Sequence, residues 1–372
     1  MHVSRYTRSN VFLTVTEFAD PRDLGFKNLR FRVSPDVRAR FSASLEEFRD
    51  VAPDFILPSR HTLTRYIVSF FEGFHSHLPF LHAPTLRLAD RPLELILAMC
   101  AAGAQYCFEH RNSERLFHAA KAILTAKMTG EMPGFGWSTK SVLTQPRNAR
   151  DVPPYIARSV PGATPTTPPP GSESRDSESH DPMEAIRCLL LLMGYATWEG
   201  SELLHEAFGL QSLLIQRLRD VGLQEESEDE STSTNLSWSD WVDQESTRRT
   251  KLVSFAFIHV HSIAYNMYPA LRSNEIHLRL PCSTREWNSQ TLTQWQTARQ
   301  DAKKQQLYFQ DALSLLLTAS DGNANINPIP SPLGNYILLH GLLQRMHLVR
   351  ELGLTYLNQS TALPNEESNK IE

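Results

Sequence analysis

Two long apolar runs constrain the fold of this chain more than any other feature. They occupy residues 93–108 (LELILAMCAAGAQYCF) and 183–198 (MEAIRCLLLLMGYATW). A helix that is apolar all round must be buried on every side, so each run needs other helices packed around it. We find no run of alternating strands, no glycine-rich phosphate loop and no fixed-period repeat in the sequence. We therefore predict an all-α, multi-helix bundle-like fold.

Apolar residues at helical spacing predict where the helices lie. The predicted helices cover 37–48, 59–78, 92–109, 113–128, 183–198, 201–221, 247–268, 292–318 and 333–352. The clearest of them follows Ser59, a residue type that caps helix N-termini, and it ends before Pro79, which cannot continue a helix. Gly222 suits the C-terminal boundary of the 201–221 helix.

The segments between the helices have compositions that cannot form a core. Residues 129–181 are rich in Pro, Ser and Gly, which predicts a disordered surface insertion. Residues 224–246 hold eight acidic residues and no basic one, which predicts a solvated acidic loop. Residues 1–57 are predicted to be weakly ordered, and 361–372 to form a disordered tail. We expect one helical core over 58–360, because neither half alone supplies partners for its all-round apolar helix.

The charge balance gives no indication of direct DNA binding. The chain of 372 residues has 37 Lys and Arg against 41 Asp and Glu, a formal net charge of −4, and no run of basic residues. A compact nucleic-acid-binding domain usually carries a basic face. If this chain acts on DNA, we expect the contact to be indirect.

Cysteine usage and hydropathy favour an intracellular protein. The four cysteines are scattered, with no C-x2-C pair, so neither a disulfide framework nor a zinc site is expected. They are Cys100, Cys107, Cys188 and Cys282. The run 93–108 is too short to cross a bilayer and is interrupted by Glu94 and Gln105. No secretory signal is recognisable at the N-terminus, so we expect the nucleus or the cytoplasm and no membrane contact.

Histidines offer the best case for a metal site, yet their spacing argues against one. His75 and His77, and likewise His259 and His261, are two residues apart, and on a helix such side chains point about 200° apart. Pro79 could fold His82 back toward His75, which leaves a helical metalloenzyme as a remote alternative. The simpler hypothesis is that the histidines satisfy carbonyl groups at the end of a helix.

Other catalytic signatures are absent from the sequence. The acidic residues 225–230 fall in a predicted loop, whereas Mg²⁺ ligands need an ordered backbone around an enclosed site. No G-x-S-x-G elbow and no Cys–His signature occurs. We predict a protein that is not an enzyme, with no catalytic residues, no metal ligands and no cofactor in this chain.

Two blocks of residues resemble a known family. The first block, within 57–86, reads LPSRHTLTRYIVSFFEGFHSHLPFLHAPTL, and its characteristic positions are Phe74, His75, Pro79, Leu81, His82, Pro84 and Thr85. The second block lies within 241–287, and its characteristic positions are Trp241, Glu245, Arg248, Arg249, Pro269, Leu280, Pro281 and Trp287. In this order, separated by the helical pair within 189–223, they resemble the fungal-specific transcription factor domain, the middle homology region of fungal transcription factors.

The resemblance covers about residues 58–352 and implies an all-α regulatory domain. The second block looks more like the branch whose members carry Cys2His2 fingers than the branch with a six-cysteine zinc cluster. Both branches place a zinc-dependent DNA-binding module before this region, and this chain contains neither, since its first cysteine is Cys100. Zinc is therefore expected only in a finger module outside this sequence.

The resemblance implies a nuclear transcriptional regulator of RNA polymerase II genes in a metabolic or biosynthetic pathway. We expect protein partners, as a homodimer or heterodimer and with the transcription machinery, and DNA contact only through a missing module or a partner. The alternative is a finger-less interaction protein that pairs with or titrates full-length factors. From the residues themselves, Arg248 and Arg249 could pair with Asp240, Asp243 or Glu245, which would be a structural role.

Overall fold

Helices make up all the regular structure of the described residues. The computed structural model describes residues 30–131, 181–225, 236–302, 305–319 and 326–360. Within these ranges extended backbone pairs only at two isolated bridges, between Gln224 and His277 and between Arg279 and Tyr308. The all-α prediction is confirmed. Most of the predicted insertion (132–180) and the whole predicted tail lie outside the described residues.

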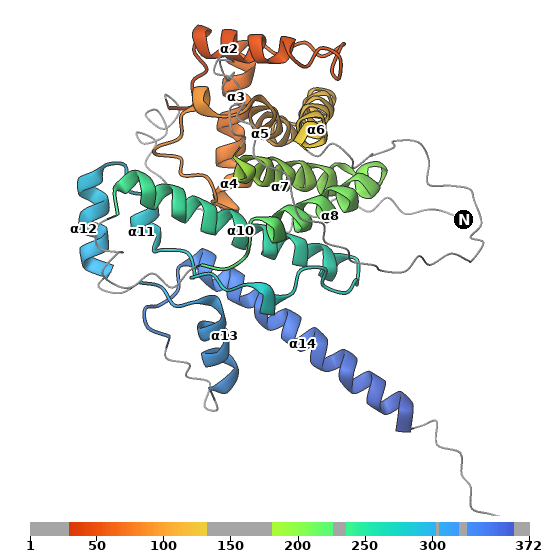
Figure 1. Ribbon diagram of the computed structural model, residues 1–372, viewed down its shortest axis with the longest axis vertical. Coiled ribbons are helices and arrows are strands. Elements are labelled where there is room, and N and C mark those ends of the chain that lie inside the picture. The colour runs from red at the N-terminus through yellow and green to blue at the C-terminus, as the bar shows by residue number, and fades with distance from the viewer. Residues whose placement is uncertain (1–29, 132–180, 226–235, 303–304, 320–325, 361–372) are drawn as a thin grey trace, which may run out of the picture.

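The two apolar runs form the centre of the fold, as predicted. They are α5 (Leu93–Tyr106) and α7 (Pro182–Glu199), which pack against each other. Every residue from 93 to 104 and from 183 to 196 is buried. The shell around them consists of α3 (Arg60–Glu72) and α6 (His110–Glu131) on α5, and α8 (Leu204–Asp220) on α7. Figure 1 shows these helices stacked above the long helix α10.

The closest backbone approach in this centre is between α3 and α5. A Cβ atom on Gly103 would lie 1.8 Å from the carbonyl oxygen of Tyr66 and 3.1 Å from the amide nitrogen of Phe70. Only a residue without a side chain fits there, so Gly103 sets the distance between the two helices.

The predicted weak order is wrong for residues 30–57, while the predicted helix over 37–48 is present; residues 1–29 lie outside the described part. Helix α2 (Pro35–Glu46) is capped by Ser34, whose Oγ accepts from the amide of Val37 at 3.2 Å. Phe41 and Leu45 are buried in the main core. The apolar spacing predicted this helix, but the polar and proline-containing composition of the segment did not predict that it packs on the core.

The predicted helix over 59–78 is divided in two. Ser59 caps α3 as expected, with its Oγ 3.2 Å from the amide of Thr62. Gly73 then leaves the helical conformation, and α4 (Phe74–His77) follows. A Cβ on Gly73 would lie 2.5 Å from the ring of Tyr106, so α5 packs directly against the break.

Helix α10 (Trp238–Ala264) begins well before the predicted Thr247, so the predicted acidic loop is wrong over 238–246. Ser237 caps the helix, since its Oγ accepts from the amide of Asp240 at 3.2 Å. Trp241 and Val242 in the first turns are buried. Residues 226–235 of the predicted loop lie outside the described residues.

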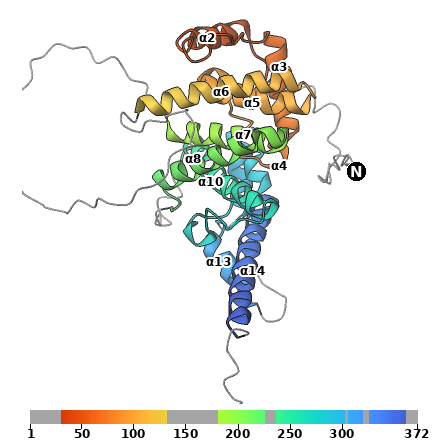
Figure 2. The ribbon, with the colours of Figure 1, turned by 90° about the vertical axis from the view of Figure 1, so that its right-hand side faces the viewer.

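The C-terminal part contains α11 (Thr284–Trp287), α12 (Leu292–Ala302), α13 (Phe309–Thr318) and α14 (Pro332–Ser360). The predicted helix over 292–318 is divided, because Leu307 and Phe309 hydrogen-bond to Leu280 and Leu278 at 2.8 Å. Helix α14 extends past the predicted Leu352 and projects from the body (Figures 1 and 2). The 3-10 turns are Leu88–Asp90, Ser201–Leu203 and Ser273–Glu275.

Hydropathy gives no sign of a membrane span: none of the described helices combines the length and the apolar content that crossing a bilayer requires.

Candidate functional site

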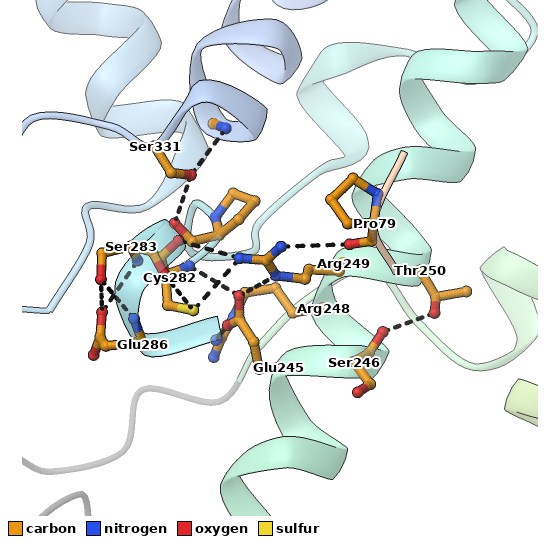
Figure 3. Close-up of polar contacts among 12 residues, drawn as sticks. Pro79, Glu245, Ser246, Arg248, Arg249, Thr250, Cys282, Ser283, Glu286 and Ser331 are labelled. Carbon is orange, nitrogen blue, oxygen red and sulfur yellow. Dashed lines mark hydrogen bonds and ion pairs between the residues drawn. The ribbon is translucent and has the colours of Figure 1, made fainter. Parts of the chain in front are cut away.

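Arg249 lies where the two motif blocks meet. Its side chain is buried on α10, and its Nε donates to Glu245 Oε1 at 2.7 Å. One terminal nitrogen donates to the carbonyl of Pro79 at 3.4 Å, and the other to the carbonyl of Cys282 at 3.2 Å (Figure 3). The guanidinium thus connects three segments that are far apart in sequence. We call this set the motif joint: Pro79, His82, Trp241, Glu245, Arg248, Arg249, Cys282 and Trp287.

Glu245 supplies the negative charge of the motif joint and is fully buried. Its Oε1 also accepts from the amide of Cys282 at 2.9 Å, and its Oε2 accepts from Arg248 at 2.5 Å. Burial alone would raise the pKa of this carboxyl, but the charges of Arg248 and Arg249 and these hydrogen bonds outweigh burial and hold it below its usual range. The predicted pairing of both arginines is therefore confirmed for Glu245.

Arg248 extends the motif joint to the segment that follows α8. Its Nε donates to Glu225 Oε1 at 2.6 Å. Burial lowers the pKa of Arg248, but the carboxylates of Glu245 and Glu225 more than compensate and raise it. Because each arginine faces at least one carboxylate, the buried charges are balanced, which a buried ion cluster requires.

Aromatic rings close the other side of the motif joint. The guanidinium carbon of Arg249 lies 3.9 Å from the centre of the Trp287 ring, a cation–π contact. The imidazole of His82 lies 4.8 Å from the same ring, edge to face. Trp287 is held in place by the capping box of α11, in which Ser283 and Glu286 satisfy each other's backbone amides.

The histidines of the first block organise a turn. His75 Nε2 accepts from the amide of Leu81 at 3.0 Å, and His82 Nδ1 lies 2.8 Å from Thr85 Oγ1. Burial lowers the pKa of His75 to about 3 and that of His82 to about 4. The hypothesis that His75 satisfies a carbonyl is wrong, because its partner is an amide. His77 is exposed, and the described ranges contain no group of three or more His, Cys, Asp or Glu placed to hold a metal.

The other motif positions have different surroundings. The ring of Phe74 packs 6.0 Å from Trp198 and 6.4 Å from Phe257. Leu280 is buried, and the carbonyl of Pro281 accepts from Ser331 at 3.3 Å. Pro84 is half-buried and Thr85 exposed beside His82. Pro269 instead lines a surface cleft of about 430 Å³ together with Arg219, Tyr268, Ala270, Arg272, Asn274 and Glu275.

Buried ion pairs inside the apolar runs escaped the sequence analysis. Glu184 is buried on α7, where its Oε1 pairs with Arg187 at 2.5 Å and with Arg91 at 2.6 Å. Glu94 on α5 pairs with Lys127 of α6 at 2.9 Å. The signal was present, because a charged residue inside an all-round apolar helix must be paired.

His259 and His261 have different partners, as their spacing predicted. The Nδ1 atoms of His259 and of His340 on α14 are 2.9 Å apart. His261 lies between Gln211 of α8 and Thr197 of α7, each at 2.7 Å. Burial lowers the pKa of all three imidazoles to about 4. These contacts attach α10 to three neighbouring helices.

We expect the buried histidines to make the fold acid-sensitive. A histidine whose pKa is lower in the folded than in the unfolded protein does not change the free energy of unfolding above its unfolded pKa, about 6.5. Below that pH it lowers the free energy of unfolding increasingly. For His75 the penalty grows by up to about 1.4 kcal/mol per pH unit down to pH 3. Urea unfolding measures the free energy of unfolding at several pH values between 7 and 5. Its decrease per pH unit should be smaller in His75→Gln than in the wild type, by up to this amount.

The matched control for this prediction is His61→Gln. His61 is exposed on α3, so comparing the two variants isolates the effect of burying the imidazole. An identical slope in His75→Gln and the wild type would show that His75 takes up its proton in the folded state.

The motif joint is a structural junction between segments that are far apart in sequence. The carboxylate of Glu245 accepts hydrogen bonds from three donors. The side chain of Arg249 donates to two carbonyls and one carboxylate and contacts one aromatic ring. Each polar atom of the two side chains thus has at least one partner within the fold. The arrangement fixes α10 against the first motif block and against the 280–287 segment.

The comparisons with known proteins agree with the motif blocks. Residues 67–355 match the family described as "Fungal specific transcription factor domain". The chain is 23% identical over 349 residues to the zinc finger protein klf1 of Schizosaccharomyces pombe, an alignment that covers 89% of this chain and 38% of the relative. The chain thus spans well under half of that relative's length. No solved structure matches. With the whole motif joint inside the matched range, the chain belongs to the fungal-specific transcription factor domain family.

Proposed function

We propose that this chain is the regulatory domain of a nuclear transcriptional regulator that acts on RNA polymerase II genes of a metabolic or biosynthetic pathway. The observation that carries the proposal is the motif joint, in which the two characteristic blocks of the family meet around Arg249. The match over residues 67–355 supports the same conclusion.

In this proposal, DNA is read by a zinc-finger module elsewhere in the full-length protein or by a partner protein. The relative in Schizosaccharomyces pombe is named a zinc finger protein, and this chain aligns with only 38% of it. The net charge of −4 and the lack of a basic run support indirect contact. Zinc would belong to that finger module.

The domain's own contribution is association with other proteins, through dimerisation or contact with the transcription machinery, without catalysis. The polar groups of the motif joint support this, because they make their hydrogen bonds within the fold. The buried helices supply a rigid body on which interaction surfaces are presented.

A tethering experiment tests the proposal. Fused to a heterologous DNA-binding module in a fungal host, the full chain should change the output of a reporter gene several-fold. The fusion with Glu245→Gln should lose most of this effect because the motif joint is broken, while Asp301→Asn, at an exposed ion pair, should retain it.

The outcome of the tethering experiment separates the two hypotheses for this chain. A wild-type fusion that is expressed, nuclear and inert would contradict a regulatory domain. If the same inert chain lowers the activity of a full-length factor, it acts as the finger-less interaction protein instead.

A further inference from the structure

A surface cleft of about 430 Å³ lies where the end of α8 meets the segment that follows α10. Its lining includes Arg219, Tyr268, Pro269, Arg272, Asn274 and Glu275. We call this set the arginine cleft. None of these residues belongs to the motif joint, so the motif joint does not account for the cleft.

The two arginines of the cleft differ in their partners. Arg219 is neutralised by Glu275, whose two carboxylate oxygens accept from its Nε at 2.8 Å and from a terminal nitrogen at 3.0 Å. Arg272 forms no ion pair with any described residue, and its exposed guanidinium lies 5.6 Å from the centre of the Tyr268 ring. The cleft therefore carries one positive charge that no carboxylate of its lining neutralises.

The backbone of the arginine cleft is held by two helices. Gln344 of α14 accepts from the amide of Ser273 at 2.8 Å and donates to the carbonyl of Leu271 at 3.0 Å. Gln310 of α13 donates to the carbonyls of Ser273 and Ile276, at 2.5 and 2.8 Å. A ligand would therefore bind a preformed surface, and less ordering on binding favours affinity.

The groups that line the arginine cleft suit a carboxylate joined to an apolar group. A guanidinium presents parallel N–H groups that bind a carboxylate in bidentate fashion. The side-chain amide of Asn274 has no hydrogen-bond partner in the part of the chain that the structure describes, so it offers further donors. Tyr268, which is 56% exposed, and Pro269 supply an apolar wall beside these donors.

A segment of a partner protein suits this cleft better than a small molecule or a nucleic acid. Small-molecule sites bury about 70–90% of their ligand, whereas Tyr268, Arg272 and Asn274 are all exposed. A partner protein brings its own cover, because its neighbouring surface excludes water from the contact. Duplex binding relies on several phosphate contacts, and a single unpaired cation beside Glu275 supplies one.

We propose that the arginine cleft binds an acidic segment of a partner protein. An Asp or Glu carboxylate of that segment pairs with the guanidinium of Arg272, and an adjacent apolar side chain packs on the ring of Tyr268. Tyr and Arg are enriched at the positions that contribute most to protein–protein binding. The inference rests on the proposed function, because it names the surface and the partner chemistry through which the domain associates with other proteins.

Fluorescence polarisation of a fluorescein-labelled peptide, GDEFDLG, titrated with the full chain from about 1 to 500 µM, tests the inference. The wild type should bind with a Kd on the order of 100 µM, since one charge-assisted contact and one apolar contact contribute. The neutral peptide GNQFNLG should bind at least about fivefold more weakly, and Arg272→Gln should weaken binding of the acidic peptide by a similar factor. The Kd of the acidic peptide should also rise with salt, which screens the exposed charges.

Arg111→Gln is the matched control variant, because it removes an exposed arginine on α6, outside the cleft, and it should bind the acidic peptide like the wild type. Tyr268→Ala removes the apolar wall and should weaken binding of both peptides. Circular dichroism and thermal unfolding verify that all variants are folded.

Three outcomes overturn the inference: unchanged polarisation of the acidic peptide up to about 500 µM protein, equal affinities for the two peptides, or equal affinities of the wild type and Arg272→Gln. A labelled DNA duplex of about 20 base pairs forms the nucleic-acid arm. If Arg272→Gln weakens duplex binding while the acidic peptide does not bind, the cleft is a phosphate site and the inference is wrong. The tethering experiment measures the proposed function independently, so a chain that changes reporter output without binding the peptide would remove only this surface.

Discussion

Replacing Gly103 by Ala is expected to destabilise the fold by more than about 3 kcal/mol, at the upper end of the cost of overpacking. The added Cβ would lie 1.8 Å from the carbonyl oxygen of Tyr66, a distance at which one helix must move. The obstacle is backbone on α3, which cannot rotate away as a side chain would. Because α5 is surrounded by α3, α6 and α7, a shift of either helix disturbs the whole centre.

Urea unfolding followed by circular dichroism measures this effect. Gly209→Ala is the matched control, since it adds the same methyl group to α8, where no atom lies within 4 Å of the new Cβ apart from its chain neighbours and the backbone of its own helix. The control should be stabilised by up to about 1 kcal/mol, because alanine favours a helix more than glycine does. Equal stabilities of the two variants would contradict the close approach of α3 and α5.

The positions of the buried helices could be predicted because periodicity reports burial. The all-round apolar runs of α5 and α7 required a surrounding shell, and the structure provides one. The start of α10 was mispredicted because the acidic composition of 224–246 was weighed above its spacing. Trp241, Glu245 and Arg249 recur every four residues and lie on one face of that helix.

The helix breaks depend on contacts between distant residues. Gly73 ends α3 where the ring of Tyr106 packs against its backbone, and nothing near Gly73 in the sequence identifies that ring. The extended segment at Leu307 is likewise stabilised by hydrogen bonds to Leu280 and Leu278. Local propensity cannot anticipate such partners, because they exist only once the core has formed.

The motif joint could be predicted in part. The pairing of Glu245 with Arg249 follows from their i, i+4 spacing on a helix. The carbonyls of Pro79 and Cys282 and the amide of Cys282 also contribute, and backbone groups leave no residue-type signal. The two motif blocks therefore identify the family from the sequence. The contacts that explain their residue types can be seen only in the folded structure.

Substituting Glu245 by Gln should cost about 3–5 kcal/mol, the typical effect of removing one member of a buried ion cluster. The amide keeps the size of the side chain but leaves Arg249 without a counter-charge, and Arg248 with Glu225 alone. The pKa of Glu245 is lowered on folding, so the carboxylate stabilises the protein above its unfolded pKa and this contribution is lost as acid protonates it. The loss should therefore be measured by urea unfolding at neutral pH.

Asp301→Asn is the matched control for this substitution, since it removes a carboxylate from the exposed pair with Arg285 and should cost no more than about 1 kcal/mol.

The double variant Glu245→Met with Arg249→Met tests whether the uncompensated charge causes the loss of stability. Removing both partners eliminates the uncompensated charge, so it should be more stable than Glu245→Gln even though it loses more hydrogen bonds. If the double variant is the less stable of the two, the hydrogen bonds and the Trp287 contact, rather than charge balance, hold the motif joint together.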